Sequence, residues 1–502
     1  MDRRMSANNA RLLFTLLASL LLAACAHVPV ESVSTNDREA IAARMMADIE
    51  VLASDELGGR KPGTPGEEAT IAFLEQRMGE AGLVSGTGDP GSYWRMPVDL
   101  VSTRALSGQL TLTQGLNSVT VPESDAIVFT PRRRALATSG PATGVPVVFV
   151  GKGDGLVLTD AMAGAVAVML PDPSRDVARR AALFDQRATA VLTVVPDEAA
   201  IARLRRAGSR ERVRLASEDK DTLSAYITDA AMAAFMGEAR WARMKADADA
   251  EDFSPIEINL AITLEAAADR REFTSYNLVG KIAGSAPDAG AVLLLGHWDH
   301  LGECGPADAE DRICKGAADN ASGIAAMLEL AQRLKSGPPL ARDIYVLATT
   351  AEESGLLGAR AFAEAPPLAL TQIVAAFNFD MVSVAPAGSA LGFIGRGATP
   401  LDQIIIDHAA RSGRTLGDEA LAASFVQRQD GAALLNAGVP TVLLSSSYGT
   451  SEILQPFLSS RYHRPSDTPA ALDLSGAVED LLLHEGLIRI IADPARYQPP
   501  AG

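Results

Sequence analysis

The chain has few of the side chains that most often bind metals, since its 502 residues include only six histidines and three cysteines. The cysteines form no Cys-x-x-Cys pair, and this argues against a zinc site built from cysteine. Basic residues are also scarce: 45 Lys and Arg stand against 62 Asp and Glu, which gives a formal net charge of −17. Nucleic acids are bound largely through Lys and Arg, so we expect no nucleic-acid partner.

The N-terminal apolar run is too short for a confident membrane span. A basic start, MDRRMSANNAR, precedes LLFTLLASLLLAA, which is shorter than the roughly 20 residues of a transmembrane helix. The run ends at LLAAC, which resembles the lipobox of bacterial lipoproteins. We therefore predict a lipoprotein signal peptide over residues 1–24, lipidation at Cys25 and a tether over residues 25–37. An ordinary signal peptide with a chance cysteine is the alternative.

This N-terminus predicts both the location and the redox state of the protein. Ala26 after the cysteine favours the outer over the inner membrane, so we expect a lipid-anchored, periplasm-facing protein of the cell envelope. A secreted or soluble periplasmic protein is the alternative. In such an oxidising compartment, Cys304 and Cys314 are predicted to form a disulfide around the loop GPADAEDRI, with two free thiols as the alternative.

The order of apolar patterns predicts an α/β fold with an insertion. From residue 251 to 495, buried-strand patterns such as AVLLLG alternate with helical ones, which is typical of a mostly parallel, mixed sheet with helices on both faces. Residues 38–123 begin with two amphipathic helices and form the N-terminal part of the same domain. Residues 124–250 hold further strands and helices but no His or Cys, so we expect a smaller inserted α/β domain. Within it, LSAYITDAAMAAFMGEARWARM is predicted as one helix.

Polar residues collect after the strands of the predicted sheet, where ligands bind in open α/β folds. They are His297 and Asp299 after AVLLLG, Glu352 and Glu353 after DIYVLATT, Asp380 after QIVAAFN, His463 in RYHRPSDT, and Asp319 at the start of the helix NASG. Each of them alone is a weak signal. Together, imidazoles and carboxylates suit zinc, and two zinc ions need about five protein ligands when one carboxylate bridges them.

Five blocks in this order, GHWDHLG, GAADNASG, TTAEESGLLGA, NFDMV and YHRPSDT, resemble the signature of the co-catalytic zinc aminopeptidases. Glutamate carboxypeptidases and glutaminyl cyclases belong to the same family. The resemblance implies a zinc exopeptidase fold, and the insertion resembles a protease-associated domain through its strand pattern and VPVVFVGKGDG. It also implies two zinc ions: His297 and Asp380 would hold one, Glu353 and His463 the other, and Asp319 would bridge them.

The same resemblance implies roles for the residues beside these ligands. Asp299 would accept a hydrogen bond from the His297 imidazole and so fix its tautomer. Glu352 would be the general base, because adjacent residues leaving a strand point to opposite sides and only one of the two glutamates reaches a metal. His300 is not expected to be a ligand: it either supports the ligands or the rim of the site, or only packs in its loop. Tyr462 is either an extra oxyanion donor or a wall residue.

We therefore expect an exported zinc-dependent aminopeptidase that acts on peptides through a water activated by two metals. A carboxypeptidase or dipeptidase on the same scaffold is the alternative, because arginines and a lysine near the motifs can form a carboxylate clamp. These are Arg312, Lys315, Arg360, Arg461 and Arg464. A binding lipoprotein without catalysis is the third hypothesis. Membrane contact is expected through the lipid only, and no pattern predicts an oligomeric state.

Overall fold

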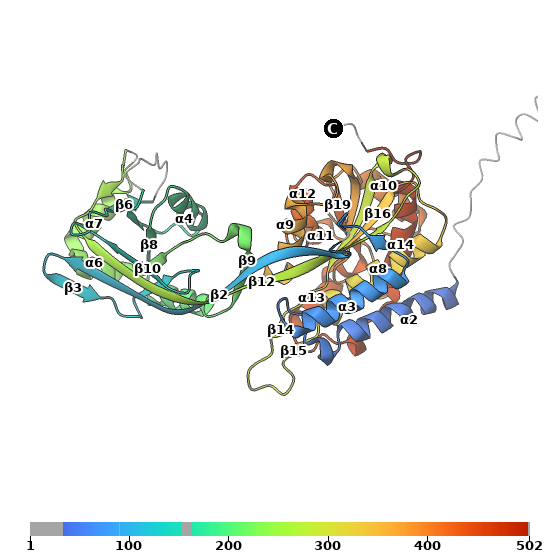
Figure 1. Cartoon of the computed structure of the whole chain (residues 1–502), viewed down its shortest axis with the longest axis horizontal. Helices are drawn as coiled ribbons and strands as arrows, with labels where there is room; N and C mark the ends of the chain where they lie inside the picture. Colours follow the sequence, from blue (N-terminus) through green and yellow to red (C-terminus); the bar gives the residue numbers. More distant parts are fainter. Residues whose placement is uncertain (1–33, 90, 153–162, 251, 500–502) are drawn as a thin grey trace, which may run out of the picture.

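The computed structural model describes residues 34–89, 91–152, 163–250 and 252–499. They form two lobes joined by two long antiparallel strands, β2 (Arg95–Gln114) and β12 (Ala261–Ile282) (Figure 1). The predicted signal peptide and Cys25 lie outside the described residues. Within the described ranges, no helix has the length and apolarity needed to cross a membrane.

The main lobe is built on a mixed sheet with a parallel centre. Its strand order is β18-β19-β17-β13-β16-β12-β2-β3, and the four central parallel strands are β13 (Ala291–His297), β16 (Asp343–Thr349), β17 (Ile373–Asn378) and β19 (Thr441–Ser445). Every residue of these four strands is buried, which agrees with their continuous apolar sequences. The predicted α/β fold with a mixed sheet is confirmed, and parallel pairing is found among the four central strands, with antiparallel pairing on either side of them.

Helices cover both faces of this sheet. One face packs against α2 (Thr35–Leu52), α3 (Pro65–Glu80), α8 (Ser322–Ser336), α10 (Asp402–Arg411) and α14 (Ser475–Ile491), and the other against α9 (Leu357–Glu364) and α12 (Gly431–Asn436). Successive residues of β13 point to opposite faces of the sheet. Leu294 packs in the core under α8 and α14, and Leu293 and Leu295 pack in the core under α9 and α12.

The first helix starts earlier than the sequence suggested. Ser34 caps α2, because its hydroxyl accepts a hydrogen bond from the Asp37 amide at 3.2 Å, so the last residues of the predicted tether are helical. The apolar stripe predicted for this helix is buried, as Ile41 and Met45 show.

The second lobe has its own six-stranded sheet and its own core. The strand order is β11-β6-β7-β8-β10-β4. The four central strands are parallel: β6 (Val147–Gly151), β7 (Val166–Met169), β8 (Ala190–Val195) and β10 (Ser224–Thr228). The two edge strands are antiparallel to their neighbours: β4 (Ala126–Phe129) and β11 (Ile256–Glu257). Helices α4 (Asp176–Asp185), α5 (Glu198–Gly208), α6 (Asp229–Met236) and α7 (Glu238–Asp247) pack on this sheet.

One helix prediction in this lobe is wrong. The stretch LSAYITDAAMAAFMGEARWARM forms strand β10 followed by the two helices α6 and α7. Thr228 ends the strand and caps α6 by accepting a hydrogen bond from the Ala231 amide at 3.2 Å, and Gly237, with φ of 86°, separates the helices. The β-branched and aromatic residues at the start of the stretch favour the strand.

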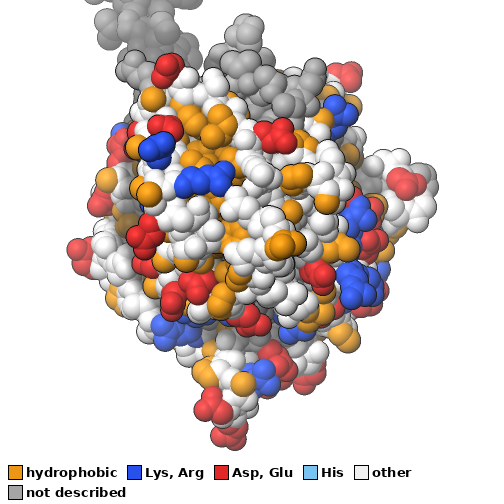
Figure 2. Space-filling model, turned by 90° about the vertical axis from the view of Figure 1, so that its left-hand side faces the viewer, with side chains coloured by type: hydrophobic (Ala, Val, Ile, Leu, Met, Phe, Trp, Pro, Cys, Tyr) orange, Lys and Arg blue, Asp and Glu red, His pale blue; other side chains and the backbone are white. Residues whose placement is uncertain are grey.

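Shorter elements complete the structure. The large sheet is extended by five short strands: β1 (Val84–Ser85), β3 (Asn117–Thr120), β5 (Ala135–Ser139), β9 (Arg212–Leu215) and β18 (Gly392–Ile394). A separate two-stranded pair joins β14 (Gly302–Glu303) to β15 (Ile313–Cys314). The main lobe also contains the helices α11 (Glu419–Ala423) and α13 (Ser451–Ser460) (Figure 1). On the end of the molecule formed by the second lobe, acidic and basic side chains are interspersed (Figure 2).

One buried histidine predicts a pH dependence of stability. His484 in α14 is fully buried, its Nδ1 lies 2.7 Å from the Asp480 carbonyl oxygen, and its ring packs beside Phe379. Burial lowers the pKa of His484 to about 4. The unfolded chain, with a histidine pKa of about 6.5, binds this proton at a higher pH, so the folded state loses stability as the pH falls from about 6.5 to 4.

The difference between the two pKa values corresponds to about 3 kcal/mol. We expect His484→Asn, which keeps a donor for the Asp480 carbonyl, to lose this acid-dependent part of the stability. Urea unfolding of both proteins between pH 7 and pH 4 measures it. The free energy of unfolding should fall less steeply in the variant, and equal slopes would contradict the prediction.

Candidate metal centre

The carboxyl ends of three parallel strands bring the predicted side chains to one edge of the large sheet. His297 is the last residue of β13, whose neighbours on either side are β16 and β17. Glu352 and Glu353 follow β16 in the short turn Glu352–Ser354, and Asp380 follows β17. The strands themselves are buried and largely apolar, so the polar side chains of the centre follow their carboxyl ends.

Three side chains meet around the His297 imidazole. Its Nε2 lies 3.4 Å from Asp319 Oδ1, 3.6 Å from Asp380 Oδ1 and 3.9 Å from Glu352 Oε2. One potential ligand atom from each of His297, Asp319 and Asp380 lies within 4.8 Å of the others. All three are buried, and Asp380 Oδ1 has no hydrogen-bond partner. Buried carboxylates are costly unless they are paired or coordinate a cation, so this donor set fits a metal ion.

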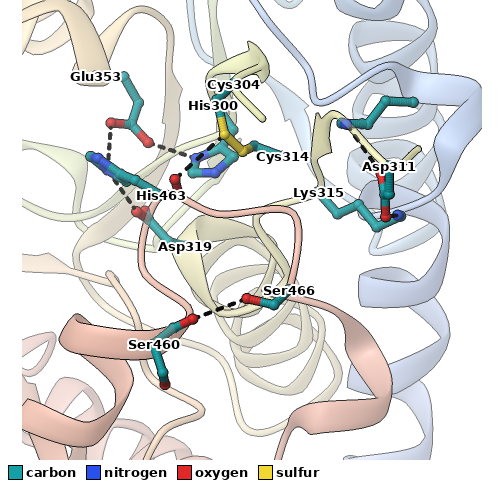
Figure 3. The surroundings of a disulfide bond; sticks show 11 residues. His300, Cys304, Asp311, Cys314, Lys315, Asp319, Glu353, Ser460, His463 and Ser466 are labelled. Carbon is teal, nitrogen blue, oxygen red and sulfur yellow. Dashed lines mark hydrogen bonds and ion pairs between the residues drawn. A yellow bond between two sulfur atoms is a disulfide. The ribbon is translucent and has the colours of Figure 1, made fainter. Parts of the chain in front are cut away.

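A second group, made of Glu353, His300 and His463, shares Asp319 with the first (Figure 3). His463 Nε2 lies 3.3 Å from Asp319 Oδ2 and 2.9 Å from Glu353 Oε2. Asp319 thus turns one oxygen to each group, which is the arrangement a bridging carboxylate requires. The structure brings all five residues of the predicted ligand set together, and their coordination of metal stays a prediction.

His300 lies deeper in the second group than the sequence suggested. It is buried, its Nδ1 is 2.6 Å from Glu353 Oε1, and the centre of its ring is 5.8 Å from that of His463. One ligand atom from each of His300, Asp319 and Glu353 lies within 4.8 Å of the others. Glu353 therefore has a histidine on each side. Burial raises the pKa of Glu353, but the contacts with the two histidines lower it by more, so its pKa lies below the ordinary value.

Asp299 differs from its expected role. His297 Nδ1 lies 3.1 Å from the backbone carbonyl oxygen of Asp299, whereas the Asp299 carboxylate is 3.8 Å away. The carboxylate accepts hydrogen bonds from the amides of Glu352 at 3.0 Å and Glu353 at 3.4 Å. The Asp299 carbonyl oxygen orients the His297 imidazole so that its Nε2 faces the carboxylates of the first group. The Asp299 carboxylate holds the turn that carries both glutamates. Burial raises the pKa of Asp299 to about 7.

Glu352 and Glu353 diverge, but not by strand alternation. Strand β16 ends at Thr349, Ala351 has a φ of 53°, and the two glutamates occupy a turn. Glu352 faces His297, and Glu353 faces His300 and His463. Burial raises the pKa of Glu352 well above its ordinary value, so this carboxylate binds a proton more readily than an exposed glutamate.

Three residues that the sequence did not single out hold this centre in place. The Asp467 carboxylate accepts the amides of Ala318 and Asp319 at 3.0–3.1 Å. The Asn320 side chain donates to the carbonyl oxygen of Phe379 at 2.8 Å, which ties the turn of Asp319 to the end of β17. Asn320 and Asp467 stand inside the blocks GAADNASG and YHRPSDT, so the signal was present beside the predicted ligands.

Arg60 is the third of these residues, and its guanidinium is wholly buried. It donates hydrogen bonds to the carbonyl oxygens of Trp298 at 2.8 Å, Leu52 at 2.6 Å, Lys315 at 2.7 Å and Gly316 at 3.0 Å. Burial lowers the pKa of Arg60 to about 10, while Asp319 and Asp299 act in the opposite direction. Its charge therefore offsets part of the acidity of the centre.

The disulfide loop lies against the second group. Cys304 and Cys314 are joined in the structure, with 5.7 Å between their Cα atoms, and Cys304 Sγ is 3.4 Å from the His463 carbonyl oxygen (Figure 3). Cys314 ends β15 and Cys304 directly follows β14, so the disulfide loop contacts the loop that carries His463.

A small cavity opens beside His297, Asp319, Glu352 and Asp380. Its other walls are Met381, Phe425, Arg428, Tyr448, Leu458 and Tyr462. The Tyr462 ring stacks on His463 with 3.7 Å between ring centres, so this tyrosine is a wall of the cavity.

The basic residues proposed as a carboxylate clamp lie elsewhere. Four of them bond to other parts of this chain: Arg312 to Glu303, Lys315 to Asp311, Arg360 to Glu218 and Arg461 to the Ala471 carbonyl. None of the five lines the cavity. Arg428, which no motif marks, does, with its guanidinium 4.8 Å from the centre of the Phe425 ring.

The comparisons with known proteins agree with the family resemblance. The model of peptidase family M28 matches residues 277–483, which contain Glu352 and all five predicted ligands. A protein of Mycobacterium tuberculosis named probable lipoprotein aminopeptidase is 28% identical over 245 residues, 43% of this chain and 46% of its own length. The alkaline phosphatase isozyme conversion protein of Escherichia coli is 36% identical over 90 residues, 17% of this chain and 25% of its own. The chain thus spans less than half the length of either relative.

Among solved structures, the aminopeptidase from Aneurinibacillus sp. strain AM-1 is similar along nearly its whole length. The TM-score is 0.52 at 20% sequence identity, and the match covers 91% of this chain and 94% of that one. At this identity the likeness shows a shared fold. The fold type expected from the sequence blocks is confirmed, and the family model matches the part of the chain that carries those blocks.

Proposed function

We propose that this chain, whose residues 277–483 belong to peptidase family M28, is a zinc-dependent exopeptidase that removes N-terminal residues from peptides. The observation that carries the proposal is the pair of donor groups that share Asp319 at the carboxyl edge of the sheet. A chain that had become a non-catalytic binding protein would not need this complete set of buried donors, whose burial is costly without a cation.

The residues of the centre support a hydrolytic mechanism. Zinc, when bound by His297, Asp380, Asp319, Glu353 and His463, supplies a Lewis acid that polarises a carbonyl and lowers the pKa of water. Glu352 accepts the proton from the attacking water and then donates it to the departing amine. Burial raises the pKa of Glu352, which makes it a better proton acceptor than an ordinary glutamate.

The cavity beside the centre suggests the substrate. Its apolar walls, Met381, Phe425 and Leu458, favour an apolar side chain next to the cleaved bond. Glu352, the carboxylate at the cavity that holds no zinc in this proposal, favours the ammonium group of a free N-terminus.

Arg428 supports a second candidate function. It lines the same cavity and no carboxylate in the described ranges pairs with it, so its guanidinium is free to bind a substrate carboxylate. A carboxypeptidase or dipeptidase on the same scaffold would use Arg428 in this way.

A mass-spectrometric time course on one pentapeptide, with a free and with an acetylated N-terminus, separates the two functions. We expect loss of the N-terminal residue from the free peptide and no reaction of the acetylated one. Loss of the C-terminal residue from both peptides would contradict the aminopeptidase and favour the alternative. Arg428→Gln, run in parallel, should then abolish the C-terminal cleavage but leave an aminopeptidase largely active.

We further propose that Cys25 carries a lipid that anchors the protein in the cell envelope, facing the periplasm. We also propose that residues 124–250, which form most of the second lobe but not its edge strand β11, are an inserted protease-associated-like domain. The LLAAC pattern supports the anchor. A Cys25→Ser variant should move from the membrane to the soluble fraction, and unchanged fractionation would contradict the lipid anchor.

A further inference from the structure

A second cavity, outside the metal centre, lies in the second lobe and has a volume of about 210 Å³. Four arginines line it: Arg180 from α4, Arg210 just before β9, and Arg212 and Arg214 from β9. No Asp or Glu is among its lining residues. Such a concentration of positive charge is unexpected in a chain with a formal net charge of −17.

The charges in this cavity are incompletely compensated. Neither Arg210 nor Arg212 pairs with a carboxylate in the described part of the chain. Arg180 lies over the Tyr226 ring, 4.8 Å from its centre, and its buried Nε has no hydrogen-bond partner. Of the four, Arg214 alone forms an ion pair within the described residues, with Asp219 at 3.3 Å. Burial lowers the pKa of Arg214, and the charge of Arg212 acts in the same direction. An anion between the guanidinium groups would remove this repulsion.

The fold fixes the direction of two of these side chains. Strand β9 lies where the two lobes meet (Figure 1). In a strand, successive side chains point to opposite faces. Val213 and Leu215 pack against the core of the main lobe beside Ala351 and Leu357, which leaves Arg212 and Arg214 on the cavity side.

We propose that this cavity is a binding site for a small oxyanion that carries phosphate or carboxylate groups. Arginine binds both groups through paired N–H donors, and Thr103 and Ser224 in the wall add hydroxyl donors. The volume suits a small molecule and is far too small for a protein or a nucleic acid. The site is independent of the peptidase function, since it shares no lining residue with the metal centre.

Isothermal titration calorimetry on the full chain tests the site with three probes: inorganic phosphate, pyrophosphate and citrate, at constant ionic strength in chloride buffer. We expect at least one of them to bind, and pyrophosphate and citrate distinguish phosphate from carboxylate recognition. The variant R210A/R212A should bind at least about tenfold more weakly, because each arginine contributes charge-assisted hydrogen bonds.

The matched control is R203A/R206A, which removes two exposed arginines of α5 that do not line the cavity. This control should bind within about twofold of the unaltered chain, since it loses the same charge at other positions. If the first double variant fails to fold, Arg212→Gln alone should still weaken binding. No binding of any probe to the unaltered chain, or equal weakening in the two double variants, would overturn the proposal.

Discussion

Glu352→Gln is expected to lower turnover by at least about 100-fold and to leave the zinc content unchanged. Glutamine keeps the size of the side chain but accepts no proton. Glu352 Oε2 is 3.9 Å from His297 Nε2, the longest of the three contacts around that nitrogen, and Glu352 belongs to neither donor group. Its loss should therefore affect the chemistry and spare the metals.

Glu353→Gln should have the opposite order of effects. Glu353 belongs to the second donor group and contacts both His300 and His463. Its replacement should therefore reduce the amount of bound zinc, while the molecules that still hold zinc should keep most of their turnover. Elemental analysis and kcat on the same samples measure both. Glu364→Gln, an exposed glutamate of α9, is the control and should change neither. Equal zinc content in the Glu352 and Glu353 variants would contradict the assignment of roles.

Asp319→Asn should have the largest effect on metal binding. Both of its oxygens are used, one toward His297 and one toward His463, so a single substitution disturbs both groups. We expect zinc affinity to fall by at least about 100-fold, because changes in the outer partners of ligands alone cost about 10- to 100-fold.

Thermal unfolding gives a second measurement of this variant. A bound ion stabilises the folded chain by about 4 kcal/mol when its free concentration is about 1,000 times the dissociation constant. A chelator should therefore lower the Tm of the unaltered chain clearly more than that of Asp319→Asn, whose weaker binding leaves less stabilisation to lose. Asp288→Asn, at an exposed position, should behave like the unaltered chain. The same chelator response in all three proteins would be incompatible with a metal held by Asp319.

The sequence was enough to predict which side chains lie close together, because most of them stand at the ends of buried strands. His297 and Asp380 follow continuous apolar runs, and parallel strands bring their carboxyl ends to one edge. Asp299 was assigned the wrong contact, because the turn after β13 brings its carbonyl oxygen, and not its carboxylate, to the His297 imidazole. Whether the carbonyl oxygen or the carboxylate of Asp299 faces the imidazole depends on the backbone torsions of this turn, and the sequence pattern does not reveal those torsions.

Other residues were missed because their importance comes from distant contacts. Arg60 bonds the carbonyl oxygen of Trp298, 238 positions along the chain, and nothing in its neighbourhood GGRKPG reveals this. Arg428 reaches the cavity from a loop without a recognisable motif. The strand β10 was read as helix because Ala and Met dominate the rest of its segment, whereas tertiary pairing with β8 and β4 decides its structure.

Anomalous diffraction at the zinc absorption edge, on crystals of the protein purified without added metal, tests the central claim most directly. The predicted result is two peaks, one between His297 and Asp380 and one between Glu353 and His463, with Asp319 in contact with both. The absence of a peak at either position, together with full peptidase activity in the presence of a chelator, would contradict the assignment of this cluster as a zinc centre.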